Sequence, residues 1–142
     1  MKFAPYLSIV IFLLAGCNRE KVVVPVSGIV TLDGKPLAGT QVTFQPIGKG
    51  KIDEELGEGS FAKTDENGKF TLKYVGPGDR MGAVVGSHRV MIAMPSGVPG
   101  SDDISKPGKI RIPVRYNTDS QLTFDVTKGG TTSANFDLTS NP

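Results

Sequence analysis

Residues 24–36 read VPVSGIVTLDGKP and predict a strand, a tight turn and the start of a second strand. Every second position is apolar on one parity, at Val24, Val26, Val30 and Leu32. Such alternation is typical of a strand with one face on a core and the other in water. The dipeptide Asp33-Gly34 adopts positive φ at low cost, which predicts the turn. A glycine inside the strand, Gly28, indicates a bulge or a close approach of another backbone.

The same alternation recurs along the rest of the chain. We expect a short strand at Ser60–Lys63 and longer strands in six stretches, residues 42–45, 69–74, 90–94, 110–116, 122–126 and 134–138. Four phenylalanines have the inward parity and are expected in the core: Phe44, Phe70, Phe124 and Phe136. Asn67-Gly68 predicts a type I′ hairpin or a related turn, with Gly68 at positive φ. Seven or eight strands without a helical period predict an all-β fold, a single antiparallel Greek-key β-sandwich.

Composition supports this fold class and excludes others. The 142 residues contain 18 Gly and 10 Pro, which excludes a helical bundle or a coiled coil. A net charge of +2 is too balanced for a nucleic-acid binder, and the single Cys excludes an intramolecular disulfide. Two stretches rich in Gly, Pro and charge, Gly48–Gly59 and Pro95–Gly108, are expected to be long solvated loops.

The N-terminus has the pattern of an export signal. Lys2 provides a positive charge, and the apolar run FAPYLSIVIFLL occupies the twelve residues from Phe3 to Leu14. A membrane-spanning helix needs about 20 apolar residues, so this run fits a secretory signal instead. It ends at Leu14-Ala15-Gly16-Cys17, which resembles the lipobox of bacterial lipoproteins. The resemblance implies that Cys17 receives a diacylglyceryl group and becomes the acylated N-terminus after cleavage.

The resemblance to lipoproteins divides the chain into three parts. Residues 1–16 are the expected signal peptide, residues 17–21 a lipidated cysteine with a short tether, and residues 22–139 the β-sandwich. The tether from Asn18 to Lys21 spans at most about 14 Å when fully extended. The residue after the cysteine is Asn18 and not the aspartate that retains enteric lipoproteins at the inner membrane. We therefore expect an exported protein, lipid-anchored in the cell envelope at the outer membrane or the periplasmic face.

The remainder of the chain resembles carboxypeptidase regulatory-like domains, which are transthyretin-like (prealbumin-like) sandwiches related in shape to the immunoglobulin fold. The opening Pro25–Gly39 followed by Val42-Thr43-Phe44 matches the start of such domains. Their hairpin "T-D-x-N-G-x-F-x-L" is matched by Thr64–Leu72, and their glycine-led strand by Gly86–Ile92. These motifs consist of turns and strand faces, so the resemblance implies a fold more than an activity.

No residue is predicted to be catalytic, to bind a cofactor or to hold a metal. The only histidine, His88, has core parity, so we expect it packed or half-exposed at the rim of the sandwich. Asp65–Gly68 is expected to be a turn, since no distal glutamate completes a calcium loop. The remaining candidates lack positioned partners and are expected in loops, in the core or at its rim: Asp53-Glu54-Glu55, Asp102-Asp103, Tyr74, Tyr116, Ser60, Ser87 and Ser101.

The sequence thus favours an envelope lipoprotein whose non-catalytic sandwich is a structural or adhesive binding module. Its expected partners are the membrane, through the lipid on Cys17, and an envelope protein or polysaccharide, but no nucleic acid. Two alternatives stay open. One is an accessory subunit of an envelope hydrolase or transport system, and the other is a divalent-cation-dependent binding module that uses the acidic loops.

Overall fold

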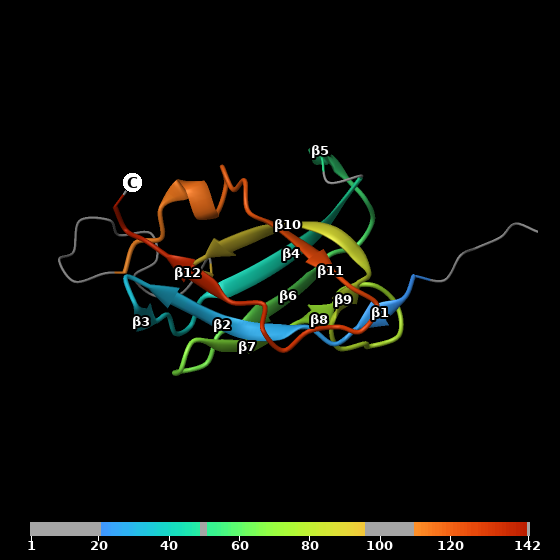
Figure 1. The fold of residues 1–142 in the computed structure, drawn as a ribbon, viewed down its shortest axis with the longest axis horizontal. Helices are drawn as coiled ribbons and strands as arrows, with labels where there is room; N and C mark the ends of the chain where they lie inside the picture. Colours follow the sequence, from blue (N-terminus) through green and yellow to red (C-terminus); the bar gives the residue numbers. More distant parts are fainter. Residues whose placement is uncertain (1–20, 49–50, 96–109, 142) are drawn as a thin grey trace, which may run out of the picture.

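The computed structural model describes residues 21–48, 51–95 and 110–141, and this part of the chain folds into a β-sandwich (Figure 1). The longer strands are β2 (Ser27–Leu32), β4 (Gln41–Gly48), β5 (Lys51–Glu55), β6 (Ser60–Lys63), β7 (Lys69–Thr71), β10 (Gly86–Ala93), β11 (Thr123–Val126) and β12 (Phe136–Leu138). Four segments have only two residues each: β1 (Val23–Val24), β3 (Lys35–Pro36), β8 (Lys73–Tyr74) and β9 (Ala83–Val84). The helical element of the described part is a single 3-10 turn, η1 (Val114–Tyr116).

The strands form two sheets and a small ribbon. The first sheet has the order β11-β10-β4-β6-β8, with β5 paired to β4. The second has the order β12-β2-β3, with β7 paired to β2, and the ribbon joins β1 to β9. Nearly all pairs are antiparallel, as predicted, but β12 runs parallel to β2, with Phe136 opposite Val30. The connection 127–135 leads from the edge of the first sheet to the second, so β12 arrives in the same direction as β2.

The predicted strand 69–74 changes sheet at its centre. β7 pairs with β2 in the second sheet, and β8 pairs with β6 in the first. Between them the buried Leu72 donates its N–H to Val26 O at 2.9 Å and accepts the N–H of Gly82 at 2.6 Å. The parity of Phe70, Leu72 and Tyr74 nevertheless holds, because all three side chains are buried.

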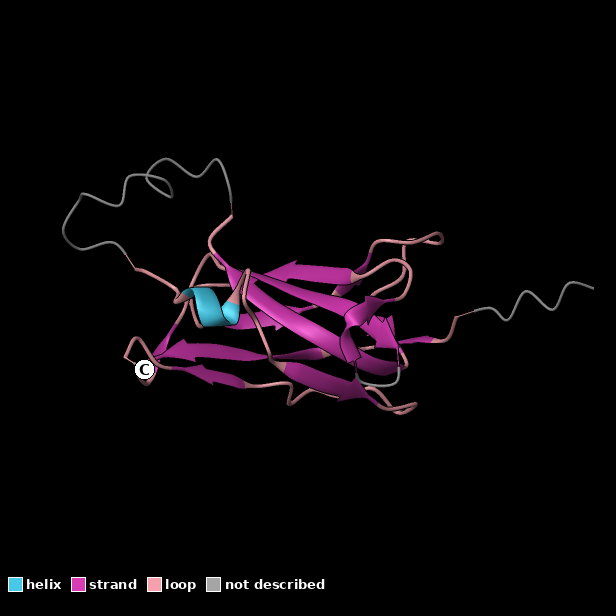
Figure 2. Cartoon of the chain, turned by 90° about the horizontal axis from the view of Figure 1, so that it is seen from above, coloured by secondary structure: helices cyan, strands magenta, loops and turns pink. Residues whose placement is uncertain are grey.

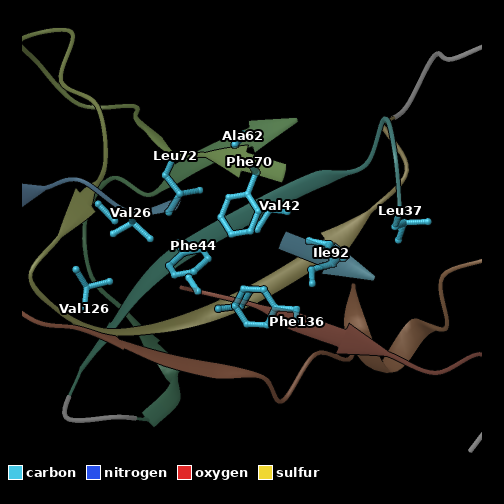
Figure 3. Packing of buried hydrophobic residues seen from close by; sticks show 14 of the residues in the cluster. Val26, Leu37, Val42, Phe44, Ala62, Phe70, Leu72, Ile92, Val126 and Phe136 are labelled. Carbon is cyan, nitrogen blue, oxygen red and sulfur yellow. The ribbon is translucent and has the colours of Figure 1, made fainter. Parts of the chain in front are cut away.

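The core lies between the sheets and is centred on Phe44 (Figure 3). Its ring centroid is 5.6 Å from that of Phe124 and 6.0 Å from that of Phe136. The Phe136 ring also lies 6.3 Å from Phe70, so four strands contribute one connected aromatic cluster. Phe44, Phe70 and Phe136 are buried and Phe124 is partly buried against them, which confirms the predicted inward parity. Each such aromatic pair contributes about 0.5–1.5 kcal/mol beyond area burial.

The two predicted turns differ in type. Asp33 (φ 51°) and Gly34 (φ 77°) are both left-handed, as a type I′ turn requires. In the second turn the left-handed residue is Gly68 (φ 72°), and its N–H bonds to Asp65 O at 3.0 Å. This is the related three-residue turn, and a Cβ on Gly68 would lie 2.4 Å from Val30 O. A Cβ on Gly28 would lie 2.0 Å from Ala134 O, which confirms the predicted close approach.

The prediction of a loop at Gly48–Gly59 is wrong in part. β4 continues to Gly48, and β5 pairs with it in an antiparallel hairpin, with Ile47 opposite Glu55. The end of β4 offers unpaired main-chain groups, and β5 pairs with them through main-chain hydrogen bonds. Such pairing does not require the alternation of apolar residues on which the sequence prediction depends. The other expected loop, Pro95–Gly108, lies outside the described residues apart from Pro95 itself.

The prediction of a strand at 110–116 is also wrong. Residues 110–113 have no regular structure, and Val114–Tyr116 form η1, closed by Tyr116 N–H to Pro113 O at 2.9 Å. Pro113 has no N–H for a ladder and its φ of −56° leads into the turn. Ile112 and Tyr116 still pack against the core, but Val114 is exposed. The apolar pattern therefore reflected partial burial and not sheet pairing.

Candidate functional site

The predicted lipidation residue, Cys17, lies outside the described residues, and the description of the chain begins four positions later at Lys21. The first paired segment follows directly, because Val23 and Val24 of β1 lie opposite Val84 and Ala83 of β9. Val22 O accepts the N–H of Val85 at 2.9 Å. The chain is thus bound to the sandwich from its first described residues, which makes this end the place to look for a function related to the N-terminus.

Lys21 belongs to a polar cluster of four residues, here called the N-terminal cluster: Lys21, Glu58, Tyr74 and Arg80. Lys21 Nζ lies 3.2 Å from Glu58 Oε2, and the Tyr74 hydroxyl donates to the same oxygen at 3.2 Å. Arg80 Nη1 donates to Lys21 O at 3.0 Å, and its guanidinium lies 5.0 Å from the centroid of the Tyr74 ring. Glu58, in the connection between β5 and β6, therefore binds the side chain of Lys21, and Arg80, in the connection between β8 and β9, binds its main chain.

Glu58 is ionised in this arrangement. The pKa of Glu58 is lowered, chiefly by a hydrogen bond from its own backbone N–H and then by the hydrogen bond and charge of Lys21. The Tyr74 hydroxyl lowers the pKa further. Since the carboxylate is exposed, the ion pair contributes little to stability and is weakened by salt. Its effect is to direct Lys21, because the carboxylate is also bonded to a tyrosine whose ring is buried.

Exposed apolar side chains occur in the segments around this cluster. Val22, Val75, Met81 and Leu56 are 60%, 59%, 52% and 50% exposed, and we call them the apolar rim. Figure 1 shows their segments at one end of the sandwich, where β1 begins and where β5 connects to β6 and β8 to β9. Backbone hydrogen bonds join these segments, for example Val75 N–H to Gly59 O at 3.0 Å.

The opposite end of the sandwich carries η1 and the C-terminus (Figure 2). Arg115 Nη2 donates to Thr139 O at 2.5 Å and to Asn141 O at 2.7 Å, while its guanidinium lies 4.8 Å from the Tyr116 ring centroid. A shallow pocket of about 220 Å³ at this end is lined by Leu32, Asp33, Lys35, Pro36, Leu37 and Ile110. Its lining contains one carboxylate, Asp33, and one amine, Lys35, and the other four lining residues are apolar.

His88 lies in β10 with its side chain in the core and 1% exposed, so it is the packed histidine that its parity predicted and is not half-exposed. Its Nδ1 is 3.0 Å from Gly86 O, and its ring centroid is 5.7 Å from that of Phe44. Nε2 is buried without a hydrogen-bond partner among the described residues. Burial lowers the pKa of His88, which keeps the ring neutral at pH 7.

The remaining sequence candidates are not brought together. Asp65 Oδ1 accepts the N–H groups of Asn67 and Lys69 at 2.8 and 2.9 Å, as a turn residue does. Within the described ranges no three His, Cys, Asp or Glu residues are grouped to hold a metal ion. Asp53-Glu54-Glu55 belong to β5, whereas Asp102-Asp103 and Ser101 lie outside the described residues. Ser87 Oγ bonds to Asp125, and the buried Ser60 Oγ has no partner in the described part.

Sequence reasoning missed the N-terminal cluster. Lys21 and Arg80 are 59 residues apart, and Glu58 stood in a stretch expected to be a solvated loop. A partial signal was available in Tyr74, whose core parity placed a buried ring with a polar hydroxyl close to a strand end. That hydroxyl needed a partner, but only the fold determines which residue supplies it.

Comparison of the chain with protein-family models, with curated proteins and with solved structures finds no match. Over the residues that the structure describes, helical structure never reaches the length and apolar character needed to cross a membrane.

Proposed function

We propose that this protein is an exported lipoprotein, anchored in the cell envelope through Cys17, whose β-sandwich is a non-catalytic structural or binding module. The observation that carries the proposal is Leu14-Ala15-Gly16-Cys17 at the end of a short apolar signal. A diacylglyceryl group with a further acyl chain provides two or three hydrocarbon chains, and each buried methylene contributes about 0.8 kcal/mol to membrane binding. Such an anchor holds the protein stably at the membrane.

The position of the folded part supports this proposal. The first strand, β1, begins at Val23, six residues after Cys17, and the core residues run from Val24 to Leu138. Removal of residues 1–16 therefore leaves every core residue in the mature chain. Strands, turns and the close approach at Gly28 are compatible with the proposed carboxypeptidase regulatory-like, transthyretin-like class. A sandwich of this kind presents loops at two ends, which suits it to bind a partner in the envelope.

Metabolic labelling with an alkyne fatty acid tests the anchor. The wild-type protein should take up label and partition into detergent, whereas Cys17→Ser should take up no label, because the thiol is the acceptor. The variant should remain as a precursor held by its uncleaved signal or as a soluble product cut by another peptidase. Asn18→Ser is the matched control, since it changes the neighbouring residue and leaves the thiol in place. Absence of label on the wild type would overturn the proposal. Membrane fractionation of the labelled protein tests the expected location in the outer membrane.

The binding role has a separate test. Crosslinking in the native envelope, followed by identification of the captured molecules by mass spectrometry, should yield a specific envelope protein or polysaccharide with the wild type. The same experiment with Cys17→Ser should lose that capture if the anchored position is required. Failure of the wild type to capture any specific partner would argue against a binding module.

A further inference from the structure

We infer that the apolar rim at the N-terminal end of the sandwich, formed by Val22, Leu56, Val75 and Met81, rests on the lipid headgroup surface. The C-terminal end with η1 then points away from the membrane. This inference depends on the proposed anchor at Cys17 and adds to it the orientation of the module and the surface that touches lipid.

The chain between the proposed anchor and the fold is short. Cys17 and Lys21 are separated by four peptide units, which reach at most about 14 Å. The headgroup layer on each side of a bilayer is roughly 5–8 Å thick. A cysteine thioether-linked to diacylglycerol lies at the inner boundary of that layer. Lys21 is therefore in the headgroup layer or at most about 9 Å beyond it.

The chain is held in place at Lys21. Arg80 Nη1 binds Lys21 O at 3.0 Å, and Glu58 Oε2 binds Lys21 Nζ at 3.2 Å. One residue later, Val22 O accepts the N–H of Val85. With the backbone bound at these points, the end of the sandwich that surrounds Lys21 is the end that faces the bilayer.

Exposed apolar side chains are concentrated at this end of the sandwich. Among the described residues, seven large hydrophobic side chains are exposed, and the four of the rim belong to segments around Lys21. Single exposed apolar residues are ordinary, but a group at one end indicates contact with another apolar or amphipathic surface.

The charges at this end indicate which kind of lipid contact to expect. Lys21 pairs with Glu58, and Lys73 Nζ lies 2.6 Å from Asp79 Oδ1. Because both lysines have carboxylate partners, their attraction to anionic lipid is reduced, and we assign the contact to the apolar side chains. Four half-exposed side chains are too few to bind membranes by themselves. They contact lipid once the anchor holds the protein at the bilayer, because tethering raises the effective concentration of the lipid surface near these side chains.

The composition of the chain allows a direct test. It contains no Trp and a single Cys. The mature chain starting at Cys17 is coupled through its thiol to a maleimide lipid in phosphatidylcholine vesicles with brominated acyl chains. Val75→Trp places a single fluorophore in the rim, and Val114→Trp is the matched control at the opposite end. The two valines are 59% and 60% exposed, so the variants differ in position and not in burial.

The coupled Val75→Trp protein should show a blue-shifted emission and about twofold quenching by brominated lipid, since tryptophan at the interface lies close to the acyl chains. The coupled Val114→Trp protein should show neither, and neither variant should be quenched without coupling. Equal quenching at both positions, stronger quenching at position 114 or quenching of the uncoupled Val75→Trp protein would overturn the inference.

Two further measurements complete the design. Circular dichroism of both variants checks that the sandwich is intact, and sedimentation of the uncoupled Val75→Trp chain checks for self-association. A dimer that shields the introduced tryptophan would assign the rim to a second copy of the chain and overturn the inference. The chemical coupling supplies the anchor in every case. Failure of cellular lipidation would therefore overturn the proposed function and leave this measurement unchanged.

Discussion

Each end of the described chain is held by an arginine that stacks on a tyrosine and donates to main-chain carbonyls. Arg80 lies over Tyr74 and binds Lys21 O, and Arg115 lies over Tyr116 and binds Thr139 O and Asn141 O. The two tyrosines differ in burial, because Tyr74 is 3% exposed and Tyr116 is only half-buried. An arginine–tyrosine pair thus binds each end of the chain, but the tyrosine is in the core at the N-terminal end and near the surface at the C-terminal end.

The partners of the tyrosine hydroxyls differ as well. Tyr74 donates to the carboxylate of Glu58, which also binds Lys21. The hydroxyl of Tyr116 lies 3.3 Å from Thr139 Oγ1, and this hydrogen bond is the main reason that the pKa of Tyr116 is lowered. At the N-terminal end the tyrosine ring belongs to the core, and its hydroxyl contacts the Lys21–Glu58 ion pair. At the C-terminal end the tyrosine and its partner Thr139 interact at the surface. This difference is compatible with the proposed lipid anchor near the N-terminal end.

Replacing the tyrosines should give the largest difference between the ends. Tyr74→Ala removes a buried ring, and truncation of a buried aromatic side chain costs about 3–5 kcal/mol in the free energy of unfolding. Tyr116→Ala should cost clearly less, because that ring is already half in water. Chemical denaturation of both variants measures the difference, with Tyr74→Phe as the control that keeps the ring. Equal losses for the two alanine variants would contradict the assignment of Tyr74 to the core.

Glycine substitutions should show how closely the backbone is packed at each end. Gly82 (φ 116°) has Val24 O only 1.8 Å from the position of a Cβ, whereas Gly34 (φ 77°) has no atom within 4 Å. Gly34→Ala should therefore cost only the left-handed backbone penalty of about 1–2 kcal/mol. Gly82→Ala should cost more, since β1 and β9 must move apart. Comparison of the two melting temperatures is the measurement, and a tolerated Gly82→Ala would mean that β1 is not held in this register.

Protonation of His88 should lower the stability of the whole sandwich, and therefore of both ends to the same extent. It serves as a control for the changes above, which should affect the two ends differently. Burial lowers the pKa of His88 below its ordinary value of 6.5, so the unfolded chain binds the proton more readily than the folded one. Stability should be unaffected by His88 above about pH 6.5 and should fall below it, by at most about 1.4 kcal/mol per pH unit, until the folded-state pKa is reached.

Unfolding curves between pH 7 and pH 5 measure how the free energy of unfolding changes with pH. His88→Met should reduce this dependence, because methionine at position 88 does not titrate. A slope that survives in His88→Met would assign the proton uptake to other groups. Hydrogen-exchange protection factors at Val24 and Leu138 should fall alike as the pH is lowered over this range, because the histidine is buried in the core that both ends share.

The smallest expected effect concerns salt. Raising the salt concentration to about 1 M shortens the screening length to about 3 Å, which weakens the Lys21–Glu58 pair. The bonds from Arg115 go to neutral carbonyls and should respond less. Hydrogen exchange at Val85, whose N–H bonds to Val22 O, should accelerate relative to Asn117, which follows η1 and whose N–H bonds to Val114 O. Glu58→Gln is the control, since it removes the ion pair and should abolish the salt dependence.

Much of the fold could be predicted from local patterns. The alternation over residues 24–32 and 90–94 follows from the two-residue period of a strand on a core, and the buried fractions agree with it. Asp33-Gly34 and Gly68 were found because a positive φ is a property of single residues. β5 could not be predicted, because a strand edge supplied by β4 forms that pair without any apolar signal in Lys51–Glu55.

The sequence by itself determined an all-β chain with inward phenylalanines and turn positions, and it led to the proposal of a lipid anchor at Cys17. These features depend on neighbours within a few residues. Only the tertiary structure decided that the strand at 69–74 changes sheet at Leu72 and that β12 runs parallel to β2. It also decided that Arg80 holds Lys21 across 59 residues. Such long-range contacts depend on how the sheets stack, since the pairing partner of a polar group is set by the whole fold and not by its own segment.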